Sequence, residues 1–346
     1  MKTLETRLQE VLDLHFDPKW GSEFWLQREK TLDFNPRTEI VSLHDIHRFG
    51  LTPTETLATE SIQHFLPRRY HQELHRCINS ETGGTTGPPK RTVFLEEEFH
   101  EAFVQPFLAA AELINFPRDL NWLYIGPSGP HVIGKGARRC AVEMGSVDPF
   151  TVDFDPRWVR KLASNPFAKN RYVEHVLDQV ASVLDTQEIG VLFATPPILT
   201  ALGQRMPQSQ REVIRGIHLG GMTADTTFWE DLTTDYFPNA VAIAGYGNSL
   251  AGVCPQVGGR PRDLPDYFAH GNRLVLDLHE PDDKGVGGVM FHRLDHSCFL
   301  PNVVERDVAQ LVPNDDVAIN KGFHTTGIHD PHPPQSSKDA VQGGLY

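Results

Sequence analysis

Short apolar runs that each end in a glycine- or proline-rich turn most constrain how this chain can fold. Segments with helical character separate the runs, and strands that alternate with helices indicate an α/β protein with a mostly parallel sheet. The carboxyl ends of such strands gather at one crevice, where open α/β sheets bind ligands. The runs are 122–125 before the turn at 126–130, 190–194 before 195–197, 217–219 before 220–221, and 241–244 before 245–247.

A helix packed on the sheet is predicted over 96–114, where Phe99, Phe103 and Phe107 recur among alanines. The acidic triplet 96–98 suits the first turn of that helix, because the helix dipole favours negative charge there.

The C-terminal part has a different texture. Short β-like pieces at 273–278 and 288–291, with a turn at 281–285, predict a small antiparallel subdomain. The stretch 329–346 is rich in Pro, Gln, Ser and Gly and predicts a loose tail. We therefore expect an α/β core for nucleotide and acid over 1–270, a small β subdomain over 271–322, and a hinge remnant with a loose tail over 323–346.

The composition of the chain limits the kinds of molecule that it could bind. The 346 residues carry a formal charge of -13, which argues against nonspecific binding to nucleic acid or an anionic membrane, since both need a basic face. The N-terminus lacks an apolar signal core, and no apolar run approaches the ~20 residues that span a bilayer, so we expect a cytoplasmic protein. The cysteines form no Cys-x-x-Cys pair, which favours buried free thiols over zinc ligands or disulfides.

The stretch 82–90, Thr-Gly-Gly-Thr-Thr-Gly-Pro-Pro-Lys, has the composition of a loop that wraps phosphate. Glycines let backbone N–H groups turn inward as an anion nest, the threonine hydroxyls add donors, and Lys90 adds charge. It is not a Walker A loop, because Pro88 and Pro89 separate the last glycine from the lysine and remove two backbone donors. A polar surface loop is the alternative interpretation. The candidate phosphate-binding residues are Thr82, Gly83, Gly84, Thr85, Thr86, Gly87 and Lys90.

The order of these residues resembles the phosphate loop of adenylate-forming enzymes, and three further motifs extend the resemblance to the phenylacetate-CoA ligase-like branch. The turn 220–222 resembles the family's Gly-Gly-Glu adenine-wall motif, and 246–250 resembles its Tyr-Gly-x-Ser/Thr-Glu motif. The stretch 300–307 resembles its Leu-Pro and Thr-Gly-Asp motif, and the turn 126–134 resembles the glycine-rich wall of the aryl-carboxylate pocket.

The resemblance implies the large N-terminal domain of an adenylate-forming enzyme, with parallel-rich sheets flanked by helices, and a site for ATP and an aromatic carboxylic acid. The acid's carboxylate would attack the α-phosphorus of ATP, so the site must neutralise charge and align both reactants. Ser249 would donate to the α-phosphate, and Asp307 would accept both ribose hydroxyls. The nucleotide residues implied beyond the loop are Gly220, Gly221, Met222, Gly245, Tyr246, Gly247, Asn248, Ser249 and Asp307, and the acid residues are Gly126, Gly129, His131, Phe193 and Ala244.

Among short members of this branch, the chain is similar to those of phenazine antibiotic (griseoluteic acid type) biosynthesis. That similarity implies a phenazine carboxylic acid, with the 1,6-dicarboxylic acid as one candidate, as the small-molecule acid to be activated.

Departures from the family pattern bear on catalysis. Leu250 stands where the family has a metal-binding Glu, Met222 replaces a polar residue, and Glu305-Arg306 replaces Thr-Gly, so the usual Mg²⁺ ligand is replaced. Family members carry a further C-terminal domain of roughly a hundred residues, and its lysine and CoA-guiding surface are not expected here. Losing one such charged group costs about 3 to 4 kcal/mol of transition-state stabilisation. We therefore expect impaired adenylation, or adenylation that depends on a protein partner. A noncatalytic aryl-acid handover protein is the alternative.

The histidines have competing interpretations. For His131 a core role and a ligand contact are balanced, since a neutral imidazole can donate to a carboxylate. His292 and His296 stand four apart in a β-like stretch, which suits a structural role, so no zinc site is predicted. His324, His329 and His332 are expected to be solvated near the hinge and tail.

Overall fold

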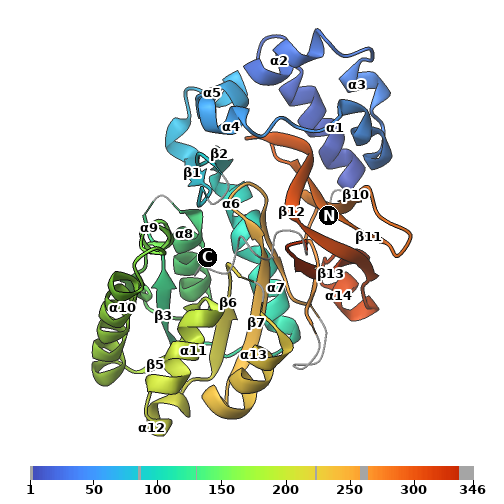
Figure 1. Ribbon diagram of the computed structural model, residues 1–346. Helices are drawn as coiled ribbons and strands as arrows, with labels where there is room; N and C mark the ends of the chain where they lie inside the picture. The colour runs from blue at the N-terminus through green and yellow to red at the C-terminus, as the bar shows by residue number, and fades with distance from the viewer. Residues whose placement is uncertain (1–2, 85–86, 130, 223, 258–263, 335–346) are drawn as a thin grey trace.

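The computed structural model describes residues 3–84, 87–129, 131–222, 224–257 and 264–334. Two larger sheets and a small hairpin organise the chain, with helices around them (Figure 1). The predicted α/β class is confirmed. Thr85 and Thr86 of the candidate phosphate loop lie outside the described residues.

A six-stranded sheet in the order β4-β3-β5-β6-β7-β8 forms the core, parallel from β4 to β7, with β8 antiparallel to β7. The four predicted strand runs all form strands of this sheet. One boundary differs, because β7 continues through the glycines at 245–247 and turns only after Asn248. A Cβ on Gly247 would lie 2.0 Å from the Gly252 carbonyl oxygen, so glycine here allows close pairing with β8 rather than a turn. The strands are β3 Asn121–Gly126, β4 Phe150–Asp153, β5 Ile189–Ala194, β6 Gly216–Leu219, β7 Val241–Asn248 and β8 Gly252–Pro255.

Helices cover both faces of this sheet because its strands are apolar on both sides. Trp122 and Tyr124 pack in one hydrophobic cluster with α6, α7 and α8, whereas Leu123 and Ile125 pack in another with α9, α10 and α11. The helices are α6 Glu96–Phe103, α7 Gln105–Leu113, α8 Val132–Glu143, α9 Pro156–Lys161, α10 Pro166–Thr186, α11 Pro196–Arg205, α12 Gln208–Arg211 and α13 Thr226–Asp231, followed by the π-helical turn η4 Leu232–Tyr236.

The helix predicted over 96–114 is divided between α6 and α7. The break falls at Val104, where the backbone leaves regular helical geometry (φ -110°, ψ -60°) two residues before Pro106. Proline lacks the N–H that a continuous helix would need at that point.

A five-stranded antiparallel sheet in the order β10-β11-β12-β13-β9 forms the second layer. The predicted pieces at 273–278 and 288–291 and the turn between them are confirmed. Residues 326–332, which the sequence places in a hinge remnant and loose tail, instead form β13, because they pair with the long β12 on one side and β9 on the other. The elements are β9 Asp266–Tyr267, β10 Leu274–His279, β11 Val286–Leu294, β12 Phe299–Pro313, α14 Asp316–Asn320 and β13 Thr326–His332.

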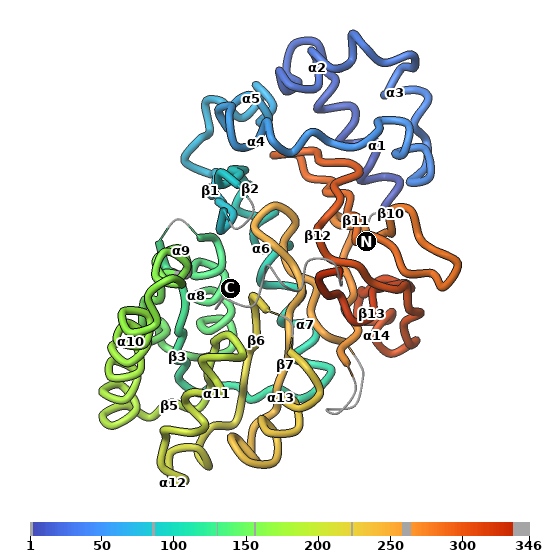
Figure 2. The backbone as a smooth tube through the Cα atoms, in the orientation of Figure 1, coloured from blue at the N-terminus to red at the C-terminus, as the bar shows by residue number. Residues whose placement is uncertain are grey.

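The N-terminal helices pack against strands from the other end of the chain, as the tube in Figure 2 shows. Trp25 donates its indole N–H to the Phe299 carbonyl at 3.1 Å, and the Thr52 N–H donates to the Asn302 carbonyl at 3.2 Å. These elements are α1 Leu4–His15, α2 Glu23–Glu29, α3 Pro36–Glu39, η1 Leu43–Phe49, α4 Thr56–Thr59, α5 Ile62–Phe65, η2 Arg68–Tyr70 and η3 Leu74–Arg76, followed by the hairpin of β1 Cys77–Glu81 and β2 Arg91–Leu95.

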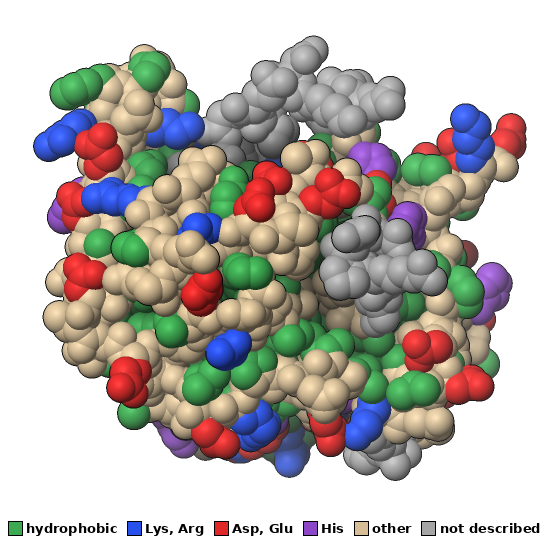
Figure 3. All heavy atoms as spheres, turned by 90° about the horizontal axis from the view of Figure 1, so that it is seen from below, with side chains coloured by type: hydrophobic (Ala, Val, Ile, Leu, Met, Phe, Trp, Pro, Cys, Tyr) green, Lys and Arg blue, Asp and Glu red, His purple; other side chains and the backbone are tan. Residues whose placement is uncertain are grey.

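None of the helices in the described ranges is long and apolar enough to cross a membrane. On the face shown in Figure 3, the coloured acidic and basic side chains are interspersed, and Lys and Arg do not gather into one patch. The cysteines are free thiols, and all but Cys77 are buried.

Candidate functional site

A cavity of about 910 Å³ opens where the carboxyl ends of β5 and β6 face the β7–β8 hairpin, β12 and the 82–90 loop. It brings together most of the residues that the sequence predicts to bind a ligand. The predicted residues that line it are Thr82, Gly83, Gly84, Gly87, Lys90, His131, Phe193, Gly220, Gly221, Met222, Gly245, Tyr246, Gly247, Asn248, Ser249 and Asp307.

Three predicted acid-binding residues do not line the cavity. Gly126 ends β3, where a Cβ would lie 2.5 Å from the Tyr124 hydroxyl, so this glycine makes room for a tyrosine that does line it. Ala244 is buried within β7, and Gly129 stands in an open turn, where a Cβ would meet nothing within 4 Å. For these three, the structure supports a role in shaping the wall rather than contact.

The 82–90 loop is closed at its base by its own ends. The Thr82 N–H donates to the Lys90 carbonyl at 3.0 Å, and the Lys90 N–H donates to the Thr82 hydroxyl at 2.9 Å. The Lys90 ammonium donates to the Thr54 hydroxyl at 2.5 Å and lies 3.9 Å from Glu55. Lys90 is therefore a cation at the cavity wall. Among the described residues, the largely exposed Glu55 lies at the limit of ion-pair distance from it, and the charge of Lys90 lowers the pKa of the buried Glu305.

Two arginines of α9 donate hydrogen bonds to the loop, and Arg160 also lines the cavity. Arg160 donates to the Gly84 carbonyl at 2.7 Å and to the Gly83 carbonyl at 3.4 Å, and Arg157 donates to the Thr82 carbonyl at 3.3 Å. Arg157 also pairs with the buried Glu81. The arginines occupy the loop's carbonyl groups and add positive charge beside it.

The N–H groups of Gly83, Gly84 and Gly87 donate to no group among the described residues. Gly84 has a φ of +62°, which only glycine adopts freely, and a Cβ there would lie 3.1 Å from the Gly87 carbonyl oxygen. Free backbone donors beside cations form an anion-binding nest. The described part of the loop therefore has the chemistry that an anion such as phosphate requires.

Tyr246 and Asp307 form the opposite polar wall. The tyrosine hydroxyl donates to Asp307 Oδ2 at 3.3 Å, while Asp307 Oδ1 is buried and has no hydrogen-bond partner among the described residues. Burial raises the pKa of Asp307 above its usual value, and Arg306 only partly offsets this. A buried carboxylate oxygen without a donor is costly, so hydroxyl groups of a ligand would stabilise it.

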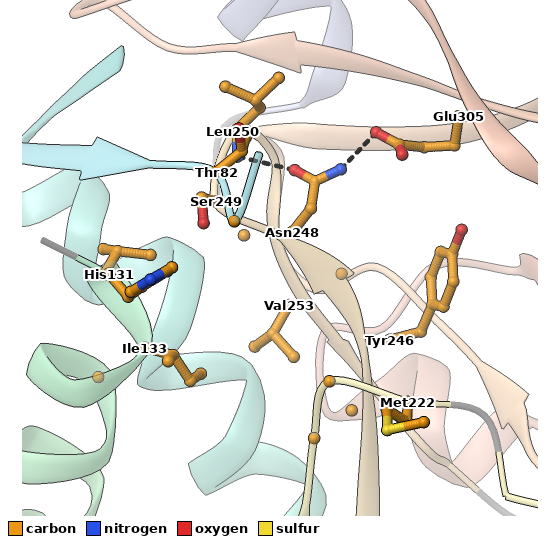
Figure 4. A pocket seen from close by; sticks show the side chains of 18 of the residues that line it. Thr82, His131, Ile133, Met222, Tyr246, Asn248, Ser249, Leu250, Val253 and Glu305 are labelled. Carbon is orange, nitrogen blue, oxygen red and sulfur yellow. Dashed lines mark hydrogen bonds between the residues drawn. The ribbon is translucent and has the colours of Figure 1, made fainter. Parts of the chain in front are cut away.

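The hairpin turn beside them uses Asn248 for its own structure. Asn248 Oδ1 accepts the N–H groups of Leu250 at 2.7 Å and Ala251 at 2.9 Å, and its amide nitrogen donates to Glu305 (Figure 4). Burial raises the pKa of Glu305, and the neighbouring Asp307 charge adds to the shift. Leu250 is 4% exposed and offers no ligand atom to a metal.

The other side of the cavity is more apolar. His131 and Ile133 lie across the cavity from Tyr246, Asn248 and Glu305, with Val253 between the two sides in the view of Figure 4. His131 is buried, and burial together with the nearby Arg157 charge lowers its pKa below the usual 6.5. It is therefore neutral near pH 7, as a donor to an uncharged or anionic ligand group should be.

His218 of β6 also lines the cavity, although the sequence analysis did not single it out. Its ring stacks between Phe193, with centroids 3.9 Å apart, and Phe107, with centroids 4.4 Å apart. Burial lowers its pKa to about 3. A histidine within an otherwise apolar strand run was the only sequence signal for it.

A separate group, His47, Asp277 and His292, places potential metal-ligand atoms within 4.8 Å of one another. His292 Nδ1 accepts the Asn302 N–H at 3.0 Å, so the neutral ring carries its proton on Nε2, the atom that faces Asp277. A metal would need that nitrogen deprotonated, whereas ligating histidines donate from the other nitrogen. The group is therefore better explained as a hydrogen-bonded link between η1 and the antiparallel sheet.

Comparison of the sequence with protein-family models and with curated proteins gives no match. Solved structures do match. The structure of 2-hydroxyisobutyryl-CoA ligase in the postadenylation state with R3-HIB-AMP has a TM-score of 0.68 and 12% identity, covering 96% of this chain and 67% of that chain. Its open conformation with 2-HIB-AMP and CoA has a TM-score of 0.67 and 11% identity, covering 94% and 67%.

The protein therefore has the fold of an adenylate-forming CoA ligase and spans about two thirds of the length of those structures. At such low identity the match carries the fold alone. The site was only partly foreseen by the motifs: Arg160, His218 and Thr54 line the cavity without belonging to any of them.

Proposed function

We propose that this protein binds ATP or AMP together with an aromatic carboxylic acid, as a member of the adenylate-forming enzymes with weak or partner-dependent catalysis. The observation that carries the proposal is the single cavity that joins an anion nest, a buried carboxylate and an aromatic wall. Its volume of about 910 Å³ lies near the upper end of the usual range for small-molecule sites.

The polar end suits a nucleotide. Lys90 and the N–H groups of Gly83, Gly84 and Gly87 would hold the phosphates. Asp307 Oδ1, which has no hydrogen-bond partner among the described residues, would accept ribose hydroxyls. Tyr246 and Tyr267, whose ring centroids lie 5.7 Å apart, offer flat surface for a base.

The apolar end suits a planar acid. Tyr124, Phe193 and His218 present aromatic rings to the cavity, and His131 lies between this wall and the phosphate loop. Aromatic rings pack well against such walls. A tricyclic acid such as phenazine-1,6-dicarboxylic acid is our candidate, within the phenylacetate-CoA ligase-like branch.

In the adenylation step, a carboxylate oxygen of the acid bonds to the α-phosphorus of ATP while the bond to the β-phosphate breaks and pyrophosphate leaves. This chain's residues would orient both reactants and neutralise charge through Lys90, Arg160 and the loop N–H groups. The side chain of Leu250 provides no oxygen for Mg²⁺, and Asn248 Oδ1 already accepts two N–H groups of the hairpin turn. The residues at this position do not fit the metal, so we assign it no role and expect slow chemistry.

Calorimetry with ATP, AMP and 1-naphthoate tests binding, and pyrophosphate exchange tests chemistry. Lys90→Gln should weaken ATP binding, whereas Lys135→Gln, a surface lysine that does not line the cavity, should not. We expect binding with little or no exchange, and no CoA thioester from the chain alone. Failure of both nucleotides to bind at millimolar concentration would refute the proposal.

A noncatalytic aryl-acid handover protein is the second candidate, and the loss of a metal ligand at Leu250 favours it. The two candidates differ in one result. Acid-dependent exchange above the rate without enzyme indicates an adenylating enzyme, whereas acid binding without any exchange indicates a handover protein.

A further inference from the structure

Two neighbouring helices outside the cavity present aromatic side chains to solvent. Trp158 of α9 is 48% exposed, and Phe167 of α10 is 75% exposed, more than any other large hydrophobic residue in the described part of the chain. Residues 162–165 join the two helices, and Figure 1 shows α9 beside the start of α10. Single exposed apolar side chains are ordinary on protein surfaces, so this pair indicates a binding surface only together with a second observation.

The second observation is the charge of the same segment. Residues 156–173 contain five Lys or Arg and no Asp or Glu, whereas the rest of the chain carries 27 Lys and Arg against 45 Asp and Glu. Arg157 and Arg171 form ion pairs, but Lys161 and Lys169 have none among the described residues, so their charge is not neutralised. Cations and exposed aromatic side chains therefore share one short segment. The α9–α10 surface consists of Trp158, Lys161, Phe167 and Lys169.

The opposite face of this segment is fixed to the parallel sheet. Val159 is buried and belongs to the same hydrophobic cluster as Val152 and Phe154. The N–H of Asp155 donates to the Tyr172 hydroxyl at 2.8 Å, which ties the start of α9 to α10. The exposed residues therefore project from anchored helices.

Helix α9 also connects this surface to the phosphate loop. Arg160 lines the cavity and donates to the Gly83 and Gly84 carbonyls, and Lys161 follows it directly in the chain. The α9–α10 surface itself does not line the cavity. A molecule docked there would lie beside the cavity without occupying it.

The distribution of charge decides what kind of partner fits. Exposed charges act over about 8 Å at physiological ionic strength, so this surface is a basic spot on an otherwise acidic chain. A membrane or a nucleic acid is an extended anionic surface, and beyond the spot it would meet the net negative charge of the other residues. A protein with a local acidic patch avoids that repulsion. Exposed Trp and Phe are also residue types that are enriched in protein interfaces.

We propose that the α9–α10 surface docks a protein whose contact face combines carboxylates, for Lys161 and Lys169, with apolar surface for Trp158 and Phe167. The inference rests on the proposed function, in which catalysis depends on a partner or the acid is handed over to one. It deepens that function by giving the partner a docking surface and a charge.

The test captures the partner in the cells that make this protein. The full chain carries the photoreactive residue benzoylphenylalanine in place of Phe167, and the control carries it in place of Val317 of α14, which is 65% exposed. The crosslinked protein is identified by mass spectrometry, purified and titrated against the full chain by calorimetry.

Charge reversal then tests the docking itself. Lys161→Glu/Lys169→Glu should weaken binding of the captured protein at least about tenfold. Lys30→Glu/Lys284→Glu makes the same change in net charge at exposed lysines elsewhere and should not weaken it. Replacing carboxylates in the crosslinked peptide of the partner with lysine should restore binding to the charge-reversed chain. Thermal unfolding confirms that each variant folds.

Three results would overturn the proposal. The first is the absence of a crosslink specific to position 167, and the second is binding that charge reversal leaves unchanged. The third is binding to vesicles of phosphatidylcholine and phosphatidylglycerol, or to oligo(dT), that is lost on charge reversal, since the surface would then serve a membrane or a nucleic acid.

ATP affinity separates this inference from the proposed function. Both double variants should bind ATP as the unaltered chain does, because the changed lysines do not line the cavity. Failure of docking with ATP binding intact overturns the docking surface alone. Failure of the unaltered chain to bind ATP refutes the proposed function, whatever the crosslinking shows.

Discussion

Two buried acidic clusters in this molecule are built on opposite principles. In the structural cluster, Asp295 receives both guanidinium groups of Arg273 and Arg293, at 2.5 to 2.9 Å. Glu98 accepts from Arg7 at 3.1 Å and from the N–H of His296 at 2.5 Å. These side chains do not line the cavity, although Arg273 and Arg293 donate to the carbonyl groups of Ala251 and Leu250 in the β7–β8 hairpin.

In the cavity cluster the carboxylates are left short of partners. Glu305 is hydrogen-bonded to Asn248, and one oxygen of Asp307 has no hydrogen-bond partner among the described residues. Arg306 lies 3.7 Å from Asp307 Oδ1 and is about half exposed, and the charges of Lys90 and Arg306 both lower the pKa of Glu305.

The pKa directions follow from that difference. Burial pushes the pKa of Glu98 upward, but the His296 hydrogen bond and the Arg7 charge hold it well below the usual value. Burial raises the pKa of Glu305 and Asp307 without a comparable offset. A buried carboxylate by itself therefore does not indicate a ligand-binding site. A buried carboxylate that lacks hydrogen-bond and ion-pair partners within the protein does.

The buried histidines repeat the contrast. His15 is bonded through both ring nitrogens, to Ser22 at 3.2 Å and to the Asp295 carbonyl at 3.0 Å. His218 has an unpartnered Nδ1 among the described residues and lines the cavity. The first is hydrogen-bonded within the folded framework, whereas the second stands beside the cavity with that nitrogen buried and unbonded.

Breaking the structural cluster should have the largest effect. Arg293→Met leaves Asp295 with Arg273 and, at 3.6 Å, Arg7, and removes donors to Thr92 and the Val93 carbonyl. We expect a loss of about 3 to 5 kcal/mol in the free energy of unfolding, measured by urea denaturation. Glu305→Gln in the cavity cluster is the control, and an equal loss there would erase the distinction between the clusters.

Acidification should destabilise the fold through the buried histidines. The pKa of His15 falls from 6.5 to about 4 because of burial, so the unfolded state takes up its proton first as pH drops. The contribution of the neutral His15 to the free energy of unfolding is complete above about pH 6.5 and is lost as the pH falls to about 4. The shift corresponds to about 3 kcal/mol at 1.36 kcal/mol per pKa unit.

Thermal unfolding across this pH range measures the effect. His218→Phe should flatten the decline, because the unligated ring contributes in the same direction with a pKa of about 3. A melting temperature that is independent of pH between 6.5 and 4 would contradict the assignment of neutral buried histidines.

Changing Asp307 should separate stability from binding. Asp307→Asn removes a carboxylate whose pKa is raised by burial, so the free energy of unfolding near neutral pH should stay equal or increase. ATP affinity should fall by about 1 to 3 kcal/mol through weaker hydrogen bonds to the ribose. Calorimetry and urea denaturation on the same preparation measure both. Unchanged affinity would remove Asp307 from the nucleotide site.

Loosening the phosphate loop should have the smallest effect. Arg160→Gln removes the hydrogen bonds to Gly83 and Gly84. We expect ATP binding to weaken by about 1 kcal/mol, since the loop N–H groups remain. Arg171→Gln, on the exposed side of α10, is the matched control. A loss shared by both variants would show a general charge effect instead of a local one.

The parallel strands could be predicted from sequence because each is a short apolar run with a clear stop. The strand β13 could not, since its residues between Thr326 and His332 have no apolar period and become ordered only by pairing with β12 and β9. The turn predicted at 245–247 was wrong for a similar reason: glycine at position 247 allows close pairing of β7 with β8, a tertiary requirement.

The candidate site also has residues that could be predicted from the sequence and residues that could not. Local motifs placed the 82–90 loop, Tyr246 and Asp307 in one cavity, because each motif carries its own chemistry in adjacent residues. His218 and Arg160 could not be predicted, since their neighbours come from other elements. Glu98 looked like an ordinary acidic first turn, yet it is buried against Arg7, which lies 91 positions earlier in the chain.

The packing of the first helices on the last strands has a kinetic consequence. Arg7 donates to the Leu294 carbonyl at 2.8 Å, across 287 positions of sequence, and Trp25 reaches Phe299 across 274. During synthesis, α1 and α2 must wait without their partners until β11 and β12 have emerged from the ribosome. Contacts of such long range slow folding and expose apolar surface meanwhile. We therefore expect the N-terminal helices to be the last part of the nascent chain to dock, and to be the segment that needs chaperone protection.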